Sequence, residues 1–223
     1  MVFELGASLA FPDPSLADED GWLAIGGDLS TARLLLAYQN GIFPWYSEGE
    51  PICWYSPHKR CVIFPDKIIV SRSMETVIAK NIFEIRINTA FEKVIKNCSQ
   101  IRRANQDGTW ISSDMQNAYI NMFEKGFARS VEAWQDGKLV GGLYGIIINN
   151  TFCGESMFSK VSNASKAALI SLCRDGHFAM IDCQLSNGHL LSMGAELIER
   201  KDYMHILNAE PDSEKLDPHR LNM

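Results

Sequence analysis

The sequence predicts an α+β fold, and three observations support that class. Strand-like alternation covers three consecutive runs, at residues 130–134, 138–148 and 151–157. The hairpin dipeptides Asp136-Gly137 and Asn149-Asn150 join these runs, which should therefore form an antiparallel meander. Beyond the meander, helical periodicity alternates with a strand, over residues 164–174, 180–184 and 202–208 in turn. Hairpins followed by mixed helices and strands are typical of α+β domains.

The first half of the chain predicts shorter elements. Ser30 is a good N-cap for a helix whose apolar stripe includes Tyr38 and which ends at Gly41. Two aromatic segments that contain proline follow, at residues 43–46 and 54–57. Short strands are expected at residues 61–64, 68–70 and 84–88, and two further helices after Thr89 and after Ser112 or Ser113.

The polar link at residues 99–108 is the expected domain boundary. It predicts a smaller N-terminal α/β domain over residues 1–105 and a larger C-terminal domain over residues 106–223. The tail from residue 210 has two prolines and little periodicity, so we expect it to be loosely held.

The net charge of −6 argues at first against a nucleic-acid partner, but the charge is unevenly distributed. Residues 58–103 hold ten Lys or Arg against four Asp or Glu, a local charge of +6, so the rest of the chain carries −12. Such a window either binds the phosphates of an RNA or is a set of ordinary solvated faces.

Metal and membrane chemistry are not indicated. The six cysteines, at positions 53, 61, 98, 153, 173 and 183, include no Cys-x-x-Cys pair, and the five histidines are scattered. Buried, reduced thiols in a cytosolic protein are the simplest interpretation. No run of 18 apolar residues is present to span a bilayer, and the N-terminus lacks the basic and apolar regions of a secretory signal.

Asp182 and Gln184 stand two apart at the end of the strand predicted over residues 180–184, which is otherwise apolar. Residues at i and i+2 of a strand share a face, so the acid and the amide are expected side by side. The pair is either part of a reaction centre or a buried hydrogen-bonded pair that fixes the fold.

Glu155 lies in the run Phe152-Cys-Gly-Glu-Ser-Met-Phe158. Gly154 beside it would let a ligand approach the backbone closely. A carboxylate buried among Phe, Cys and Met needs a cationic partner, and a substrate is one such partner. The alternative is a side chain that projects into solvent from an edge strand.

No glycine-rich phosphate loop is present, because neither Gly-x-x-x-x-Gly-Lys-Ser nor Gly-x-Gly-x-x-Gly occurs. The strand-to-helix turn at residues 159–165 also lacks glycine, which argues against a pyrophosphate cofactor such as coenzyme A. Trp45, Trp54, Tyr55 and Trp110 either stack on unpaired bases or pack in the core.

A set of short motifs runs in order from about Phe11 to about Asn208. They are Gly26-Gly-Asp-Leu-Ser30, Gly41-Ile-Phe-Pro-Trp45, Trp54-Tyr-Ser-Pro57, Ser71-Arg-Ser-Met74, Gly108-Thr-Trp-Ile111, Ser130-Val-Glu132, Leu139-Val-Gly-Gly142, Phe152-Cys-Gly-Glu-Ser-Met-Phe-Ser159, Asn163-Ala-Ser-Lys166, Asp182-Cys-Gln184 and Asn187-x-His189-x-x-Ser192-x-Gly194. Each motif alone is weak, but the ordered set is highly specific. By these motifs the chain resembles the leucyl/phenylalanyl-tRNA–protein transferase family.

The resemblance implies a GNAT-type acyltransferase C-terminal domain joined to the smaller N-terminal domain. It implies donors Leu-tRNA and Phe-tRNA, with Met used less well, and acceptor proteins that begin with Arg or Lys. The products would enter the N-degron degradation pathway. It further implies a cytoplasmic, monomeric enzyme with no metal, no organic cofactor and no membrane partner.

The resemblance also assigns residues. The positions that match the family's reaction centre are Asp182, Gln184 and Glu155. Those that match aminoacyl-adenosine binding are Trp45 and Trp110 at the terminal adenosine, Leu143, Phe152 and Met157 around the donor side chain, and Ser156. The basic window adds candidate contacts to the tRNA backbone, at Lys59, Arg60, Arg72, Arg102 and Arg103.

Three positions depart from the family pattern. Arg129 stands where the family usually has His, Leu143 where Met is common, and Tyr55 where Trp is frequent. Two other functions stay compatible with the residues, an acetyltransferase that uses acetyl-CoA and an RNA-binding module without catalysis.

Overall fold

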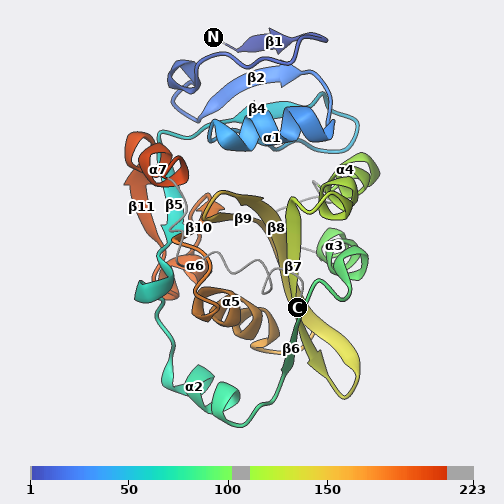
Figure 1. The fold of residues 1–223 in the computed structure, drawn as a ribbon, viewed down its shortest axis with the longest axis vertical. Coiled ribbons are helices and arrows are strands. Elements are labelled where there is room, and N and C mark those ends of the chain that lie inside the picture. The colour runs from blue at the N-terminus through green and yellow to red at the C-terminus, as the bar shows by residue number, and fades with distance from the viewer. Residues whose placement is uncertain (1, 102–110, 210–223) are drawn as a thin grey trace.

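The computed structural model describes residues 2–101 and 111–209. Within them the chain forms a small and a large β-sheet, with helices between and around them (Figure 1). The predicted meander is present in the large sheet, so the α+β class is confirmed. The tail from residue 210 and the link from residue 102 lie outside the described residues.

The small sheet is built from the first 55 residues. Its strand order is β1 (Phe3–Leu5), β2 (Trp22–Gly26), β4 (Cys53–Tyr55) and β3 (Phe43–Pro44), and a 3-10 helix, η1 (Pro14–Leu16), lies between β1 and β2. Helix α1 (Thr31–Gln39) packs between the two sheets (Figure 1). As predicted, Ser30 caps α1 by accepting the Arg33 N–H, and Gly41 follows the helix with φ of 69°.

The large sheet carries seven strands. Their order is β11 (Glu196–Glu199), β5 (Lys59–Ile63), β10 (Met180–Gln184), β9 (Thr151–Ser159), β8 (Lys138–Ile148), β7 (Ala128–Gln135) and β6 (Glu84–Ile87). Strands β6 to β9 are antiparallel neighbours, β9 and β10 run parallel, and β5 pairs antiparallel with both β10 and β11.

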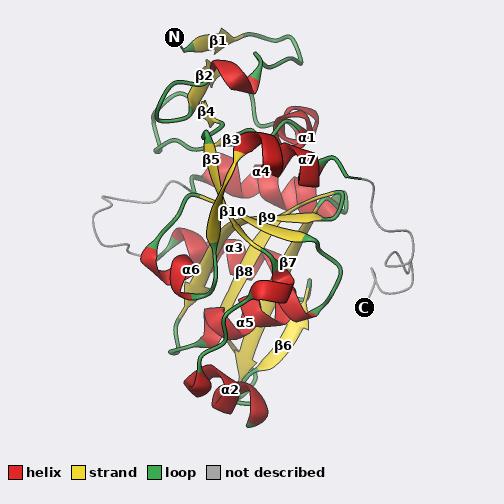
Figure 2. Cartoon of the chain, turned by 90° about the vertical axis from the view of Figure 1, so that its left-hand side faces the viewer, coloured by secondary structure: helices red, strands yellow, loops and turns green. Residues whose placement is uncertain are grey.

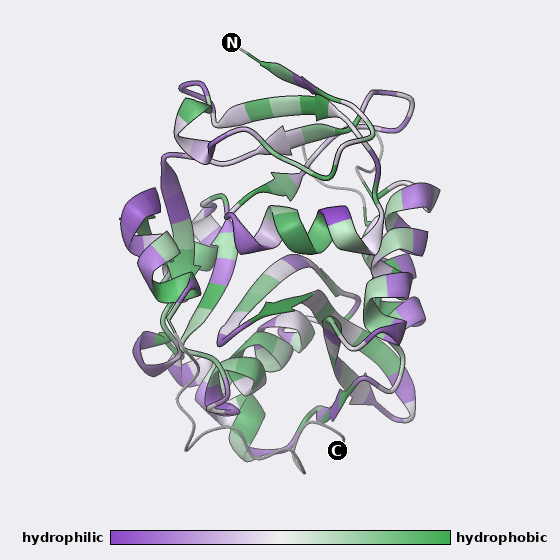
Figure 3. Ribbon diagram, turned by 45° about the horizontal axis from the view of Figure 1, so that its top comes forward, coloured by the Kyte–Doolittle hydropathy of each residue, from purple (hydrophilic) through white to green (hydrophobic). Residues whose placement is uncertain are grey.

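Helices cover both faces of the large sheet (Figure 2), and each face has its own apolar cluster. On one face lie α5 (Ala164–Arg174) and α2 (Arg72–Ala79), and on the other lie α3 (Phe91–Ser99) and α4 (Ser113–Glu124), which also contacts α1. Most residues of α5 are buried, and Figure 3 colours the chain by residue hydropathy. Two short helices complete the described chain, α6 (Gly188–Ser192) and α7 (Arg200–Leu207).

Two local predictions were wrong. Residues 68–70 form no strand, because Pro65 starts a 3-10 turn, η2 (Pro65–Lys67), and the Ile69 N–H then bonds the Met193 carbonyl in a loop. Thr89 does not cap α3, which begins at Phe91 after Ala90 without a cap from its own neighbours. A carboxylate from β7, Glu132, accepts hydrogen bonds from the N–H groups of Thr89 and Ala90 instead.

The chain passes from one sheet to the other between Tyr55 and Lys59. Lys59–Ile63 and Glu84–Ile87, which precede the boundary expected at residue 105, both pair into the large sheet. The order of elements along the chain does not say which distant strand an edge will join, so this pairing could not be predicted from sequence.

Candidate active site

A cavity of about 520 Å³ lies where β9 and β10 separate. The two strands pair over three residues each, from Thr151 to Cys153 and from Met180 to Asp182, and then part. The lining residues come from β3, β8, β9, α5, β10 and the segment that follows β10: Phe43, Pro44, Trp45, Leu143, Phe152, Gly154, Glu155, Ser156, Met157, Leu169, Ile181, Cys183, Gln184, Leu185, Ser186, Asn187, His189 and Leu190. An apolar cavity with a few polar groups suits an apolar ligand that is oriented by hydrogen bonds.

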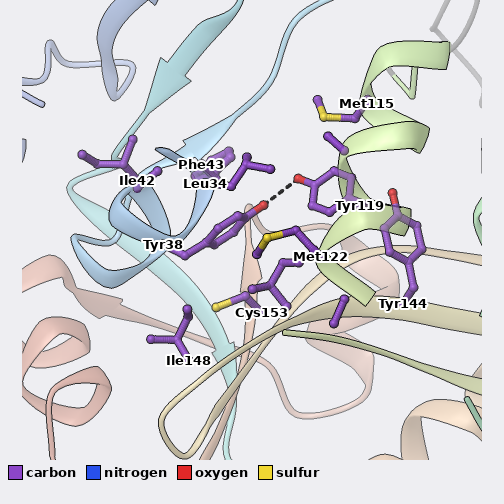
Figure 4. Packing of buried hydrophobic residues seen from close by; sticks show 14 of the residues in the cluster. Leu34, Tyr38, Ile42, Phe43, Met115, Tyr119, Met122, Tyr144, Ile148 and Cys153 are labelled. Carbon is purple, nitrogen blue, oxygen red and sulfur yellow. Dashed lines mark hydrogen bonds between the residues drawn. The ribbon is translucent and has the colours of Figure 1, made fainter. Parts of the chain in front are cut away.

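Glu155 is the carboxyl group of this cavity wall, and neutral groups surround it. The Tyr38 hydroxyl donates to Oε1 at 2.7 Å, and the Tyr119 hydroxyl donates to Oε2 at 2.7 Å. The Gln184 side-chain amide also reaches Oε1, at 3.3 Å. The two tyrosine oxygens are themselves 2.6 Å apart, the contact drawn in Figure 4. Over residues 2–101 and 111–209, no Lys or Arg forms a salt bridge with Glu155.

Asp182 has the opposite environment, because it is paired with a buried guanidinium. Arg60 Nε and Nη2 donate to its two oxygens, each at 2.8 Å, and the Tyr203 hydroxyl adds a bond at 3.0 Å. The Asp182 side chain is fully buried, and Arg60 is 1% exposed between the rings of Phe43 and Tyr203. The third Arg60 contact, from Nη1 to the Gly41 carbonyl, ties this pair to the end of α1.

Gln184 is displaced from the regular strand by a bulge. The register of β10 on β5 shifts between Asp182 and Gln184, and Gln184 has a left-handed φ of 54°. Asp182 Oδ1 accepts the backbone N–H of Gln184 at 2.9 Å, which holds the bulge in place. The two side chains therefore do not stand side by side as strand spacing predicted. Gln184 lines the cavity, whereas Asp182 lies behind it in the ion pair.

Burial is the main cause of the raised pKa values of Glu155, Tyr38 and Tyr119. It raises the pKa of Glu155 from 4.5 to about 7, although the hydrogen bonds from Tyr38 and Tyr119 act in the lowering direction. Burial, followed by the charge of Glu155, raises the pKa of Tyr38 and of Tyr119 well above 10, so both stay hydroxyls. Burial acts to lower the pKa of Arg60, but Asp182 outweighs it and raises that pKa above its ordinary value.

Two family models match the sequence. The description "Leucyl/phenylalanyl-tRNA protein transferase" applies to residues 62–208, and that of the same family's N-terminal domain applies to residues 27–58. The chain belongs to the leucyl/phenylalanyl-tRNA–protein transferase family. The two matches meet between residues 58 and 62, close to where the chain passes from the small sheet to the large one.

Relatives support this membership over more than 90% of the chain. A leucyl/phenylalanyl-tRNA–protein transferase of Flavobacterium johnsoniae is 51% identical over 212 residues, which cover 94% of this chain and 100% of the relative. One from Flavobacterium psychrophilum is 53% identical over 206 residues, covering 91% and 98% respectively. Among solved structures, L-PGS from Bacillus licheniformis has a TM-score of 0.39 at 10% identity, over 74% of this chain and 54% of that chain, too low to inform on fold or function.

Most site residues assigned from the family resemblance meet in the one cavity. They are Trp45, Leu143, Phe152, Glu155, Ser156, Met157 and Gln184. Phe152 and Leu143 are buried in its wall, while Trp45 is 42% exposed at its edge and packs edge-on against Tyr55 at 5.7 Å. Trp110 lies outside the described residues.

The expected tRNA contacts divide into three groups. Lys59 and Arg72 are exposed, as a phosphate contact requires. Arg60 is a correction, since its guanidinium is buried against Asp182 and is not available to a phosphate. Arg102 and Arg103 lie outside the described residues. Arg129, which stands where the family usually has His, forms an ion pair with Asp175, with 3.4 Å between Nη1 and Oδ2. Neither residue lines the cavity.

The turn between β9 and α5 is filled by its own hydrogen bonds. The N–H groups of Lys160 and Val161 donate to the Val140 carbonyl, and that of Ala164 donates to the Val161 carbonyl. The N–H of Ser165 donates to the Ser159 hydroxyl. These four backbone donors are already satisfied by the protein, so the turn offers a pyrophosphate little to bind.

No group of three or more His, Cys, Asp or Glu is placed to hold a metal ion within the described ranges. Four of the six cysteines are buried and two are partly buried, and all are free thiols. None of the helices in residues 2–101 and 111–209 is both long and apolar enough to cross a bilayer.

Sequence reasoning missed the groups that surround the two carboxylates. Tyr38 was assigned to an apolar stripe and Tyr119 lay unremarked between the apolar positions of α4. Their hydroxyls point toward each other (Figure 4), and both bond Glu155. A fully buried tyrosine needs a partner for its hydroxyl, and that requirement was the available signal. Nothing in the sequence marked Arg60 or Tyr203 as partners of Asp182, because 122 and 21 residues separate them from it.

Proposed function

We propose that this protein transfers Leu or Phe, and Met less well, from aminoacyl-tRNA to the N-terminal amine of proteins that begin with Arg or Lys. The observation that carries this proposal is the convergence of Trp45, Leu143, Phe152, Met157 and Gln184 on one cavity in a chain of this family. The products would be substrates of N-degron degradation, and the enzyme would act in the cytoplasm as a monomer.

The large sheet is proposed to be a GNAT-type acyltransferase domain, with the small sheet as the N-terminal domain. Support comes from an antiparallel meander followed by a helix and a parallel strand, with the cavity at the point where the parallel strands part. The separation matters because it exposes inward-facing side chains of β9 and β10 to a ligand.

The donor is proposed to enter with its aminoacyl side chain between Leu143, Phe152 and Met157. Burial of a leucyl or phenylalanyl side chain there contributes roughly 1.5–3 kcal/mol. Trp45, exposed at the cavity edge, is placed to stack on the terminal adenine, with Trp110 as its proposed partner. Ser156 would hydrogen bond the aminoacyl group, and the exposed Lys59 and Arg72, with Arg102 and Arg103, would contact the tRNA backbone.

The reaction forms an amide from an ester that is already activated, so alignment of the amine is the main requirement. The Gln184 amide points its NH₂ group at Glu155, which leaves its carbonyl oxygen to accept a hydrogen bond from the attacking amine. As the bond between nitrogen and the carbonyl carbon forms, the bond from that carbon to the ribose oxygen breaks. The amine gives up one proton and the ribose oxygen gains one.

Asp182 is proposed to position the Gln184 side chain for this step. Its bond to the Gln184 N–H holds the bulge that aims the amide, and Arg60 holds Asp182. Asp182 is thus a positioning residue, while Gln184 touches the reacting amine. Glu155 is proposed to attract the cationic side chain of the acceptor's first residue.

Two other functions fit less well. An acetyltransferase would need a cradle for the pyrophosphate of coenzyme A, and four backbone donors of the turn at residues 159–165, those of Lys160, Val161, Ala164 and Ser165, are already engaged. An RNA-binding module without catalysis would have no use for an apolar cavity closed by Gln184 and Glu155.

The test is one mixture of labelled Leu-tRNA, a peptide with N-terminal Arg, and the protein. Label should move to the peptide, and the same peptide with an acetylated N-terminus should stay unlabelled because it has no free amine. Excess acetyl-CoA should leave the rate unchanged. Label that stays on the tRNA at every enzyme concentration would show that the proposed function is wrong.

A further inference from the structure

Three oxygen-bearing side chains form a closed triangle beside the cavity. Tyr38 comes from α1, Tyr119 from α4 and Glu155 from β9, so three separate elements meet here. The two distances from hydroxyl to carboxyl are 2.7 Å, and the distance from hydroxyl to hydroxyl is 2.6 Å. Oxygen atoms this close require a hydrogen between them in each of the three contacts.

Counting hydrogens decides the protonation state of the triangle. With an ionised Glu155, the triangle holds two hydrogens, one on each tyrosine, and both are donated to the carboxylate. The contact between Tyr38 and Tyr119 would then have no hydrogen, and two lone pairs would face each other at 2.6 Å. A protonated carboxyl supplies the third hydrogen, so that each contact has one.

We propose that Glu155 is a neutral carboxylic acid in the resting protein and that its proton closes a ring of three hydrogen bonds with Tyr38 and Tyr119. In this ring Glu155 Oε2–H donates to Tyr119, which reverses the direction of that bond from the one it has with an ionised Glu155, while Tyr119 donates to Tyr38 and Tyr38 donates to Glu155 Oε1. Oε1 is then a carbonyl oxygen, and it also accepts the Gln184 amide.

The charged surroundings agree with this assignment. Asp182 disfavours a second negative charge nearby, and Arg60 favours it but is already held by Asp182. The Cys153 thiol also faces Glu155, and burial raises its pKa well above 9, so it stays neutral. Tyr144 lies edge-on to Tyr119, with ring centroids 5.6 Å apart. Because the resulting pKa of Glu155 is about 7, a small rise in pH above neutrality or a bound cation can remove the proton.

Glu132 is a second buried carboxyl group of the large sheet, with different partners. It accepts hydrogen bonds from two backbone N–H groups, of Thr89 and Ala90, and from the hydroxyls of Thr89 and Ser130. A backbone N–H can only donate, whereas a hydroxyl can donate or accept. Both tyrosine partners of Glu155 are hydroxyls that can accept a carboxyl proton, whereas two of the partners of Glu132 cannot.

The proton on Glu155 is linked to binding of the acceptor, an inference that rests on the proposed function. A cationic acceptor residue favours the ionised form of Glu155, so acceptor binding and loss of this proton are linked. Glu155 would then change from an acid that closes the ring to a carboxylate that receives the acceptor. Acceptor affinity is expected to rise with pH through the pKa of Glu155.

Infrared difference spectroscopy of the full chain tests the proton directly. At pH 6, below the Glu155 pKa of about 7, the wild-type protein should show the C=O stretch of a protonated carboxylic acid that Glu155→Gln lacks. The band should fade with a midpoint near pH 7, and Glu132→Gln should retain it. A Glu155 that shows only carboxylate bands at pH 6 would overturn the proposal, and this result needs no activity and no ligand.

A second measurement tests the link to the acceptor. The ratio of kcat/KM for an N-terminal Arg peptide, wild type over Glu155→Gln, should rise about tenfold per pH unit below pH 7 and level off above it. Titration of the peptide's own amine cancels in this ratio. A flat ratio with the infrared band present would refute the acceptor link alone, whereas absence of transfer by both proteins would refute the proposed function and leave the infrared result to decide the proton.

Discussion

Asp182 and Glu155 are two carboxyl groups on neighbouring parts of one sheet, and their surroundings differ. Asp182 meets a guanidinium that is as buried as itself, so its charge is fixed by an ion pair. Glu155 meets two tyrosines and an amide, so its charge is open to adjustment near neutral pH. The difference suggests that one carboxyl group maintains the shape of the site while the other responds to what enters it.

Removing the Asp182 carboxylate should have the largest effect on the free energy of unfolding. Asp182→Ala leaves Arg60 buried without a partner, and the free energy of unfolding should fall by about 3–5 kcal/mol. Urea unfolding followed by circular dichroism measures it. Glu84→Ala, which breaks the exposed pair with Arg86, is the matched control and should change stability little. A small loss for Asp182→Ala, similar to that of the control, would contradict a structural role for the ion pair.

The adjustable charge should appear as a pH dependence of stability. The folded pKa of Glu155 is about 7 and the unfolded value about 4.5, so between these values the folded state binds more protons. Stability should therefore fall as pH rises through that window, by about 2–3 kcal/mol after allowing for partial exposure, and stay lower above it. Glu155→Gln should lack this decline in urea titrations at pH 5 and pH 8. Parallel pH profiles for the two proteins would mean that Glu155 does not titrate there.

Glu132 sharpens the comparison because two of its partners are backbone N–H groups, which can only donate. Glu132→Gln places an NH₂ group among N–H donors and weakens the cap of α3, so stability should fall by about 2 kcal/mol. At pH 8, Glu155→Gln should be at least as stable as wild type, since a glutamine can occupy the ring as a protonated glutamate does. Equal losses from the two substitutions would remove the distinction between the sites.

Removing one tyrosine hydroxyl from the hydrogen-bond ring around Glu155 should have the smallest effect on stability. Tyr119→Phe removes one hydroxyl, and the expected loss is about 1 kcal/mol in urea unfolding at pH 6. Tyr38→Phe should behave similarly, and the double variant should lose less than the sum because both single variants break the same ring. Strict additivity of the two losses would indicate that the tyrosines act independently.

The sequence predicted the meander, the helices after Ser30 and Ser112 and the strand at residues 180–184, because periodicity and caps are local. Through the family motifs it also predicted the cavity residues from Trp45 to Gln184. It did not predict the bulge at Gln184 or the partner of Asp182, since both depend on strand β5, which is about 120 residues away. For the same reason it assigned Arg60 to the tRNA surface when it is the counter-ion of Asp182.

Strand β5 lies between β10 and β11, so residues 59–63 pair only with residues from 180 onward. During synthesis from the N-terminus, this strand is made more than a hundred residues before either partner. Contacts so distant in sequence form late, because closing a long loop costs conformational entropy before the contacts contribute any stability. The Arg60–Asp182 pair, the bulge and the cavity should therefore assemble only on a nearly finished chain, so a truncated nascent chain would have no working site.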